Sequence, residues 1–65
     1  MMTMKDRIES ALHTAISESR HAVQELAAAA MRHDPRSIGY WEEMSKYWLG
    51  RIEHYAQQLK EVNAN

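Results

Sequence analysis

The residues with the most obvious potential for chemistry lie in the segment "ESRH" at positions 18–21. Glu18 and His21 have the Glu-x-x-His spacing by which helical carboxylate bundles hold iron or manganese, with ligands that project inward. In the helix expected here, Ser19 and Ala22 take the inward positions. We therefore expect Glu18 and His21 on the flank or outside of the helix, and we predict neither a metal site nor a cofactor.

A serine with a histidine on either side forms a second constellation. Ser17 lies four residues from both His13 and His21, so a hydroxyl and an imidazole can meet on one helical face. Nucleophilic catalysis also needs an orienting third group, an oxyanion donor set and a pocket, and continuous helices this short supply no obvious one. We predict no catalytic residue and no enzymatic activity.

A third group forms a stripe along the second half of the chain. Its members follow one another by three or four residues: Tyr40, Met44, Tyr47, Arg51, His54 and Gln58. Gly50 lies next to this stripe at an outward position, where a mid-helix glycine costs about 1 kcal/mol relative to alanine. Tyrosine, arginine and histidine near a bare backbone are typical of binding surfaces. In the simpler alternative, Tyr40, Met44 and Tyr47 complete a bundle core, with Arg51 and His54 on its rim.

Two helices are needed to position these residues. Thr3 and Asp6 form a pair of capping-box type, and apolar residues then recur at spacings of three and four. Pro35 disfavours helical geometry at Asp34, so we predict the first helix at about 4–33. Its seam, the line of residues that faces the partner helix, is Ile8, Leu12, Ala15, Ser19, Ala22, Leu26, Ala29 and His33.

The second helix is predicted at about 39–62, after a turn at 34–38. Either Asp34 caps it with Pro35 in the first position, or Ser37 caps it. Its seam is Ile38, Trp41, Ser45, Trp48, Ile52, Tyr55, Leu59 and Val62, a heptad pattern without a slip. We interpret His33, at the turn, as a cation at the C-terminal end of the first helix.

The two seams differ in the size of their side chains. The first repeats alanine at 15, 22 and 29, and the second repeats Trp41, Trp48 and Tyr55. Small residues opposite large ones allow helices to interdigitate, so we interpret the aromatic stripe as core. Whether Trp48 faces Ala22 or Leu26 depends on where the turn is centred. The predicted fold is all-α, an antiparallel two-helix hairpin in a single domain over 1–65.

A lone hairpin of this size buries too little apolar surface to be stable on its own. At 65 residues and without cysteine, the usual reinforcement left to it is self-association. The apolar stripe is wider than the seam, as in a bundle. The residues that flank the seam are Ile16, Val23 and Ala30 on the first helix and Leu49 and Ala56 on the second. We expect a homodimeric four-helix bundle or a higher oligomer. The predicted core and interface residues are Leu12, Ala15, Ile16, Ala22, Val23, Leu26, Ala29, Trp41, Trp48, Leu49, Ile52, Tyr55 and Leu59.

The layout resembles the ROP-type hairpin dimers, which also stack small layers against large ones. The resemblance is architectural, and no functional residue carries over. A nucleic-acid reader needs a basic stripe, whereas the net charge is −1 and the outer face of the first helix carries Asp6, His13, Arg20 and Ala27. The longest apolar run, residues 26–31, is too short to span a bilayer. The start has no apolar stretch of signal-peptide type, so we expect a cytoplasmic protein without a membrane segment.

Three hypotheses for function follow. The first is a non-enzymatic, homo-oligomeric protein-interaction module that acts on an unidentified protein partner as adaptor, inhibitor or regulator. The second is a binding or sequestering protein for a small anionic ligand such as a nucleotide, with sites between subunits lined by Tyr47, Arg51 and His54. The third, a nucleic-acid-binding regulator, lacks the basic surface that it would need.

Overall fold

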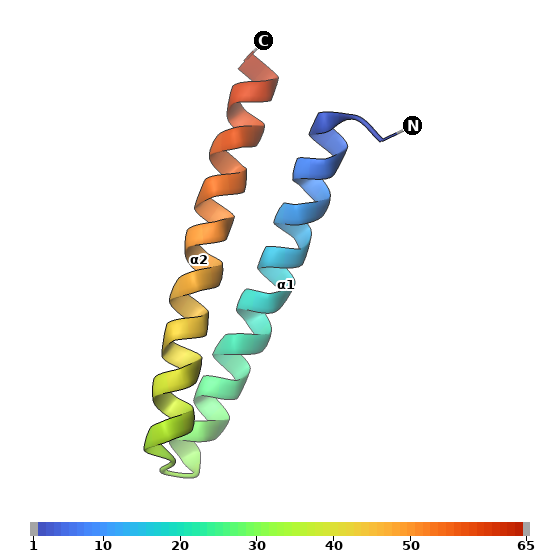
Figure 1. The fold of residues 1–65 in the computed structure, drawn as a ribbon. Helices are drawn as coiled ribbons and strands as arrows, with labels where there is room; N and C mark the ends of the chain where they lie inside the picture. Colours follow the sequence, from blue (N-terminus) through green and yellow to red (C-terminus); the bar gives the residue numbers. More distant parts are fainter. Residues whose placement is uncertain (1, 65) are drawn as a thin grey trace.

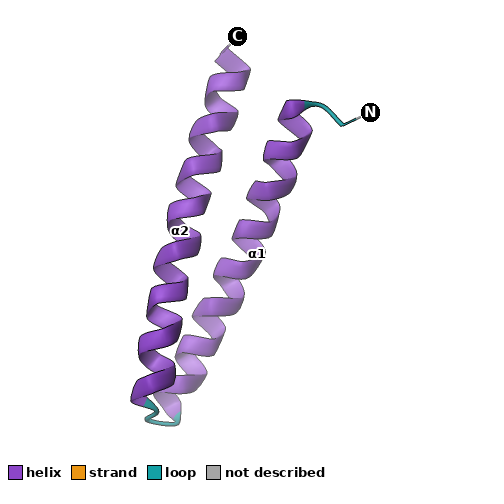
Figure 2. Ribbon diagram, in the orientation of Figure 1, coloured by secondary structure: helices purple, strands orange, loops and turns teal. Residues whose placement is uncertain are grey.

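The protein is an antiparallel pair of long helices. A computed structural model describes residues 2–64 and contains α1 (Met4–Met31) and α2 (Pro35–Ala64), joined by a short turn. The two helices run side by side from the turn (Figure 1). The described residues outside the helices are the turn at 32–34 and residues 2–3, which precede α1 (Figure 2). The prediction of an all-α two-helix hairpin is confirmed.

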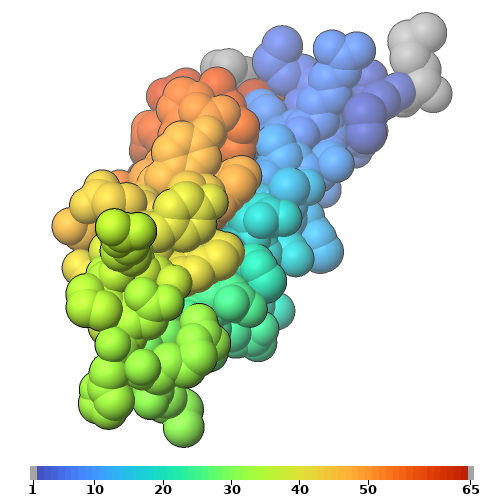
Figure 3. All heavy atoms as spheres, turned by 60° about the horizontal axis from the view of Figure 1, so that its bottom comes forward, coloured from blue at the N-terminus to red at the C-terminus, as the bar shows by residue number. Residues whose placement is uncertain are grey.

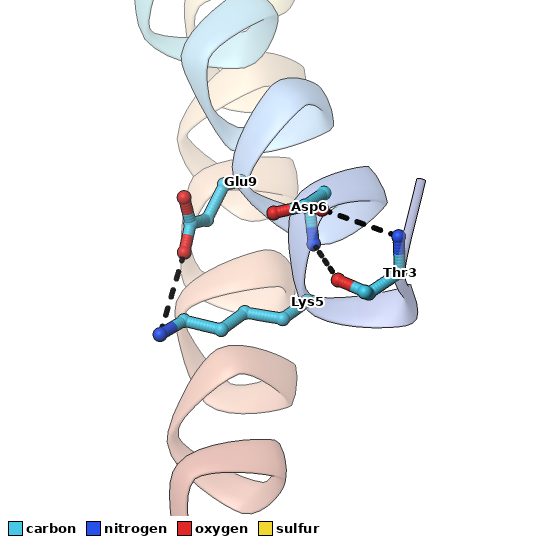
Figure 4. A network of polar contacts seen from close by, with 4 residues as sticks. All are labelled: Thr3, Lys5, Asp6 and Glu9. Carbon is cyan, nitrogen blue, oxygen red and sulfur yellow. Dashed lines mark hydrogen bonds and ion pairs between the residues drawn. The ribbon is translucent and has the colours of Figure 1, made fainter. Parts of the chain in front are cut away.

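The N-terminus of α1 is closed by a capping box, as the sequence predicts. The Thr3 hydroxyl oxygen accepts a hydrogen bond of 3.1 Å from the Asp6 backbone N–H, and the Asp6 carboxylate accepts one of 3.2 Å from the Thr3 backbone N–H (Figure 4). These bonds satisfy donors that a helix start otherwise leaves free. An exposed ion pair of 3.9 Å between Lys5 and Glu9 lies one turn further on and adds little stability.

The C-terminus of α1 is a Schellman motif. The His33 backbone N–H donates to the Ala30 carbonyl and the Asp34 backbone N–H to the Ala29 carbonyl, each at 3.1 Å, which is the bond pattern of that motif. His33 has a φ of 55°, in the left-handed position where glycine is usual. The predicted end of the helix near residue 33 is therefore wrong: α1 ends at Met31, and His33 is exposed rather than part of the seam.

The start of α2 is set by Asp34 and Pro35. The Asp34 carboxylate accepts hydrogen bonds from the Ser37 backbone N–H at 3.3 Å and from the Ser37 hydroxyl at 2.8 Å. Of the two caps considered, the structure has Asp34, with Pro35 at the first helical position where its missing N–H costs nothing. The predicted helix start near residue 39 and turn at 34–38 are therefore wrong by about one helical turn.

The same contacts change the acidity of Asp34. The hydrogen bonds from the Ser37 hydroxyl and backbone hold the pKa of the Asp34 carboxyl below its ordinary value of 3.8, and the charge of Arg32 adds to this effect. These donors stabilise the ionised carboxylate. Asp34 thus closes the turn from both sides, with its backbone in the motif that ends α1 and its side chain at the start of α2.

The seam lies between the helices, as predicted, but it makes a thin core. The buried residues of α1 are Ile8, Ala15, Ser19, Ala22 and Ala29. In α2 no residue is buried, and both tryptophans of its seam are only half-buried. Figure 3, with the turn in front, shows the two helices against each other as one elongated layer. The hairpin has a long inner seam but no enclosed interior.

Candidate interaction surfaces

The two flanks of the α2 seam are covered to different extents. Met44, Arg51 and Gln58 repeat every seven residues along one flank, and all three are half-buried. Leu49 and Ala56 lie along the other flank and are exposed, with 51% of Leu49 accessible. The covered flank thus carries Arg51 and Gln58, whereas the uncovered flank presents the apolar Leu49 and Ala56, with the exposed Glu42 in the same row.

The flanks of the α1 seam follow the same rule. Ala11 and Glu25 are half-buried on one side, although Glu18, between them in the same row, is exposed. On the other side Ile16 is half-buried, Val23 is 52% exposed and Ala30 is exposed. Two antiparallel helices are related by a two-fold axis normal to the plane that contains both of them. This axis places the corresponding flanks of the two helices on the same side of the hairpin. The hairpin therefore has a closed side and an open side.

We name the apolar residues of the open side the open face. Its members are Ile16, Val23, Ala30, Leu49 and Ala56. The sequence predicts all five as apolar positions that widen the stripe beyond the seam. The structure shows that the partner helix of the same chain leaves most of this face uncovered.

A row of aromatic rings lies on α2 beside the closed side. Each ring of Tyr40, Tyr47 and His54, which we name the aromatic ridge, packs edge-on against the seam aromatic that follows it in sequence. The ring centroids are 4.8 Å apart for Tyr40 and Trp41 and 5.0 Å apart for Tyr47 and Trp48, within the range of favourable edge-to-face pairs. Tyr40 and Tyr47 are still 57% and 54% exposed, so the ridge is both held in place and accessible.

Arg51 is directed along its own helix. Its guanidinium carbon lies 4.7 Å from the centroid of the Tyr55 ring, and its Nη2 donates to the Tyr55 hydroxyl. A cation over an aromatic face is a favourable contact, and it draws the guanidinium toward the seam. Arg51 and His54 therefore both contact Tyr55, His54 at 5.5 Å between ring centroids.

The other predicted members of the candidate surface divide between the two environments. Met44 is half-buried, as the bundle-core alternative expects, whereas Tyr47 is more than half exposed. Gly50 faces open space: a side chain added there would meet no other atom within 4 Å. The outward position predicted for Gly50 is confirmed, and the structure shows no close approach within the hairpin that requires glycine.

The residues considered for metal binding and catalysis lie outside the seam. Glu18 and His21 are both exposed, and His13, Ser17 and His21 border a shallow groove on the outer surface of α1. Within residues 2–64 no group of three or more His, Asp or Glu side chains has the arrangement to hold a metal ion. Neither described helix is long and apolar enough to cross a membrane.

Comparison with known proteins identifies no relative. No protein-family model matches the chain, and no curated protein and no solved structure matches it at a significant level. The resemblance to ROP-type dimers thus rests on the pattern of the seam alone.

Sequence reasoning missed two kinds of contact made by the aromatic side chains of α2. The first is the pairing of adjacent rings, although its signal is visible as aromatic pairs at 40–41, 47–48 and 54–55 with a seven-residue repeat. The second is His21, whose ring meets Trp41 of the other helix edge-on at 5.5 Å. No pattern in the sequence singles out His21 for this contact, because it depends on the register of the two helices.

Proposed function

We propose that this protein is a non-enzymatic, homo-oligomeric interaction module that acts by binding a protein partner, as an adaptor, inhibitor or regulator. The observation that carries the proposal is the exposure of α2. None of its residues is buried in the hairpin, and Tyr40, Tyr47 and Leu49 are each more than half exposed. Large side chains held on rigid helices but uncovered by their own chain are available for contact with other chains.

The aromatic ridge supports a role in protein recognition. Tyrosine supplies a large contact area at low conformational cost and is enriched where protein interfaces are energetically strong. Here the rings of Tyr40 and Tyr47 are already fixed by packing on Trp41 and Trp48. Binding through the ridge therefore loses little side-chain entropy.

The second hypothesis, a site for a small anionic ligand, has less support. It needs Arg51 to point toward an incoming anion, and the Arg51 guanidinium instead lies over the Tyr55 ring. The groove beside His13 and Ser17 is shallow and open to solvent, and such a surface does not enclose a small molecule. These observations favour a protein partner over a small ligand.

Capture from an extract of the native host tests the proposal. The full chain is immobilised, and bound proteins are identified by mass spectrometry for the wild type, Tyr47→Ala and a matched control, Gln57→Ala. Gln57 is exposed on the same helix and belongs to neither face. We expect one protein to be retained by the wild type and the control and reduced at least tenfold by Tyr47→Ala.

A thermal-shift panel of metabolites and nucleotides runs in parallel. A ligand that binds only the folded state raises the melting temperature. A saturable shift with a nucleotide, together with no protein captured through Tyr47, would replace the proposal by the ligand hypothesis.

A further inference from the structure

We propose that a second copy of the hairpin covers the open face, so that Ile16, Val23 and Leu49 enter the core of a four-helix assembly while the aromatic ridge stays outside it. This inference rests on the self-association in the proposed function and adds which surface is used. It assigns the open face to self-association and the aromatic ridge to the protein partner.

The first argument is the inverted polarity of the two sides. Val23 and Leu49 are about half exposed, whereas Arg51 and Gln58 are half-buried on the opposite flank. A chain that is stable alone gains by the reverse arrangement, because apolar burial is the main favourable term in folding. The arrangement is favourable once another surface removes the open face from water.

The second argument is the area involved. The hairpin exposes 5109 Å², whereas a compact monomer of this mass exposes about 4,300 Å². The excess of about 800 Å² equals the share that one partner contributes to a protein–protein interface of standard size. The surplus surface is thus what a stable dimer needs to bury.

The third argument identifies the occupant as a copy of the same chain. Charged residues of both signs border the open face: Arg20, Lys46 and Glu53, together with Glu42 in the row of Leu49, all exposed. A second hairpin offers the same mixture of positive and negative side chains and can pair with it. A partner whose surface carries charges of a single sign cannot. The alanines at 30 and 56 also permit the close approach that helices in a bundle require.

The aromatic ridge cannot take part in the same contact. It adjoins the closed side, which is the opposite flank of the α2 seam from Leu49 and Ala56. Tyr40 and Tyr47 therefore remain accessible in the assembly. One protein can then bind itself through the open face and a different partner through the ridge.

A matched pair of substitutions tests this assignment. Leu49→Glu and Tyr47→Glu place the same charge two residues apart on one helix, at side chains exposed to 51% and 54% in the hairpin. Because the Tyr47 ring also packs on Trp48, Tyr47→Glu should destabilise an isolated hairpin at least as much as Leu49→Glu. Sedimentation equilibrium over a range of concentrations gives the dissociation constant of each. We expect Leu49→Glu to weaken self-association at least 100-fold and Tyr47→Glu to change it less than threefold.

The outcomes separate the inference from the proposal on which it rests. A folded wild-type monomer at every concentration would refute self-association itself. A wild-type dimer that dissociates equally with both substitutions, with Tyr47→Glu alone or with neither would refute only the assignment of the open face.

A second measurement applies if Leu49→Glu fails to fold. The chain has no cysteine, so Ala56→Cys and His54→Cys each introduce one thiol, the second with loss of the His54 ring contact on Tyr55. We expect iodoacetamide to modify the thiol at position 56 at least tenfold more slowly than in urea, and the thiol at 54 at nearly the urea rate. Equal rates at the two positions, or protection at 54 alone, would overturn the inference.

Discussion

His33 provides a local test of the turn, because its left-handed backbone conformation is unfavourable for a residue that has a side chain. It has a φ of 55° in the Schellman motif that ends α1, and its side chain is exposed. Glycine adopts this conformation freely, whereas an L-residue meets a clash between Cβ and the carbonyl oxygen. His33→Gly should therefore stabilise the hairpin without removing a packing contact from the seam.

The expected gain follows from two opposing terms. Relief of the left-handed conformation raises the free energy of unfolding by about 1 to 2 kcal/mol. The greater freedom of glycine in the unfolded chain reduces this gain by roughly 0.4 to 1 kcal/mol. The net stabilisation is about 0 to 1.6 kcal/mol, with a midpoint of about 0.8 kcal/mol. For a chain of this length each kcal/mol raises the melting temperature by about 4 to 8 °C.

Thermal unfolding followed by circular dichroism at 222 nm measures this gain. All variants are compared at one protein concentration, because association shifts the midpoint. His33→Val is the matched control and should lower the midpoint, since β-branched residues tolerate positive φ least. A midpoint lowered by His33→Gly and unchanged by His33→Val would refute the left-handed turn.

Four further predictions concern the caps, the seam and Gly50. Thr3→Ala should destabilise the hairpin by about 1 kcal/mol in urea unfolding through loss of the capping box, and no loss would mean that the start of α1 frays. The folded state lowers the pKa of Asp34, so ionised Asp34 contributes fully to the free energy of unfolding above its ordinary pKa of 3.8. That contribution is lost as the pH falls through the lower pKa of the folded state. Asp34→Asn should therefore flatten this part of the acid unfolding curve, and an unchanged curve would contradict the cap. Trp48→Ala should cost about 3 kcal/mol or more in the assembled protein, whereas a loss below about 1 kcal/mol would mean an exposed ring. Gly50→Ala should stabilise by up to about 1 kcal/mol, and Gly50→Gln should keep helicity and the oligomeric mass yet weaken partner capture; unchanged capture would exclude Gly50 from the partner-binding surface.

The helices and the seam could be predicted from sequence because their signals are local. The capping box needs only Thr3 and Asp6 at a fixed spacing, and the seam needs only the three-and-four period of apolar residues. Both are present in the structure. The end of α1 was misplaced because a histidine occupies a position where the usual signal is glycine. With that signal absent, the periodic pattern continued through His33.

The candidate surfaces were only partly predictable, because they depend on how the helices rotate about their axes. Periodicity gives two flanks for each seam but does not say which flank the partner helix covers. The register was also open in the sequence. Counted from His33, the observed turn places Trp48 level with position 18, so Ser19 rather than Ala22 or Leu26 is the nearest position of the α1 seam. The sequence pattern could not show that polar Arg51 is half-buried while apolar Leu49 is exposed.

The account depends above all on self-association, and sedimentation equilibrium of the wild-type chain with helicity measured on the same samples tests it most directly. We predict a mass of twice the 7.6 kDa of the chain at micromolar concentration, and a loss of helicity on dilution as the assembly dissociates, because a hairpin with no buried residue in α2 has too small a core to stay folded alone. A fully helical, cooperatively folded monomer of 7.6 kDa across that range would contradict the account.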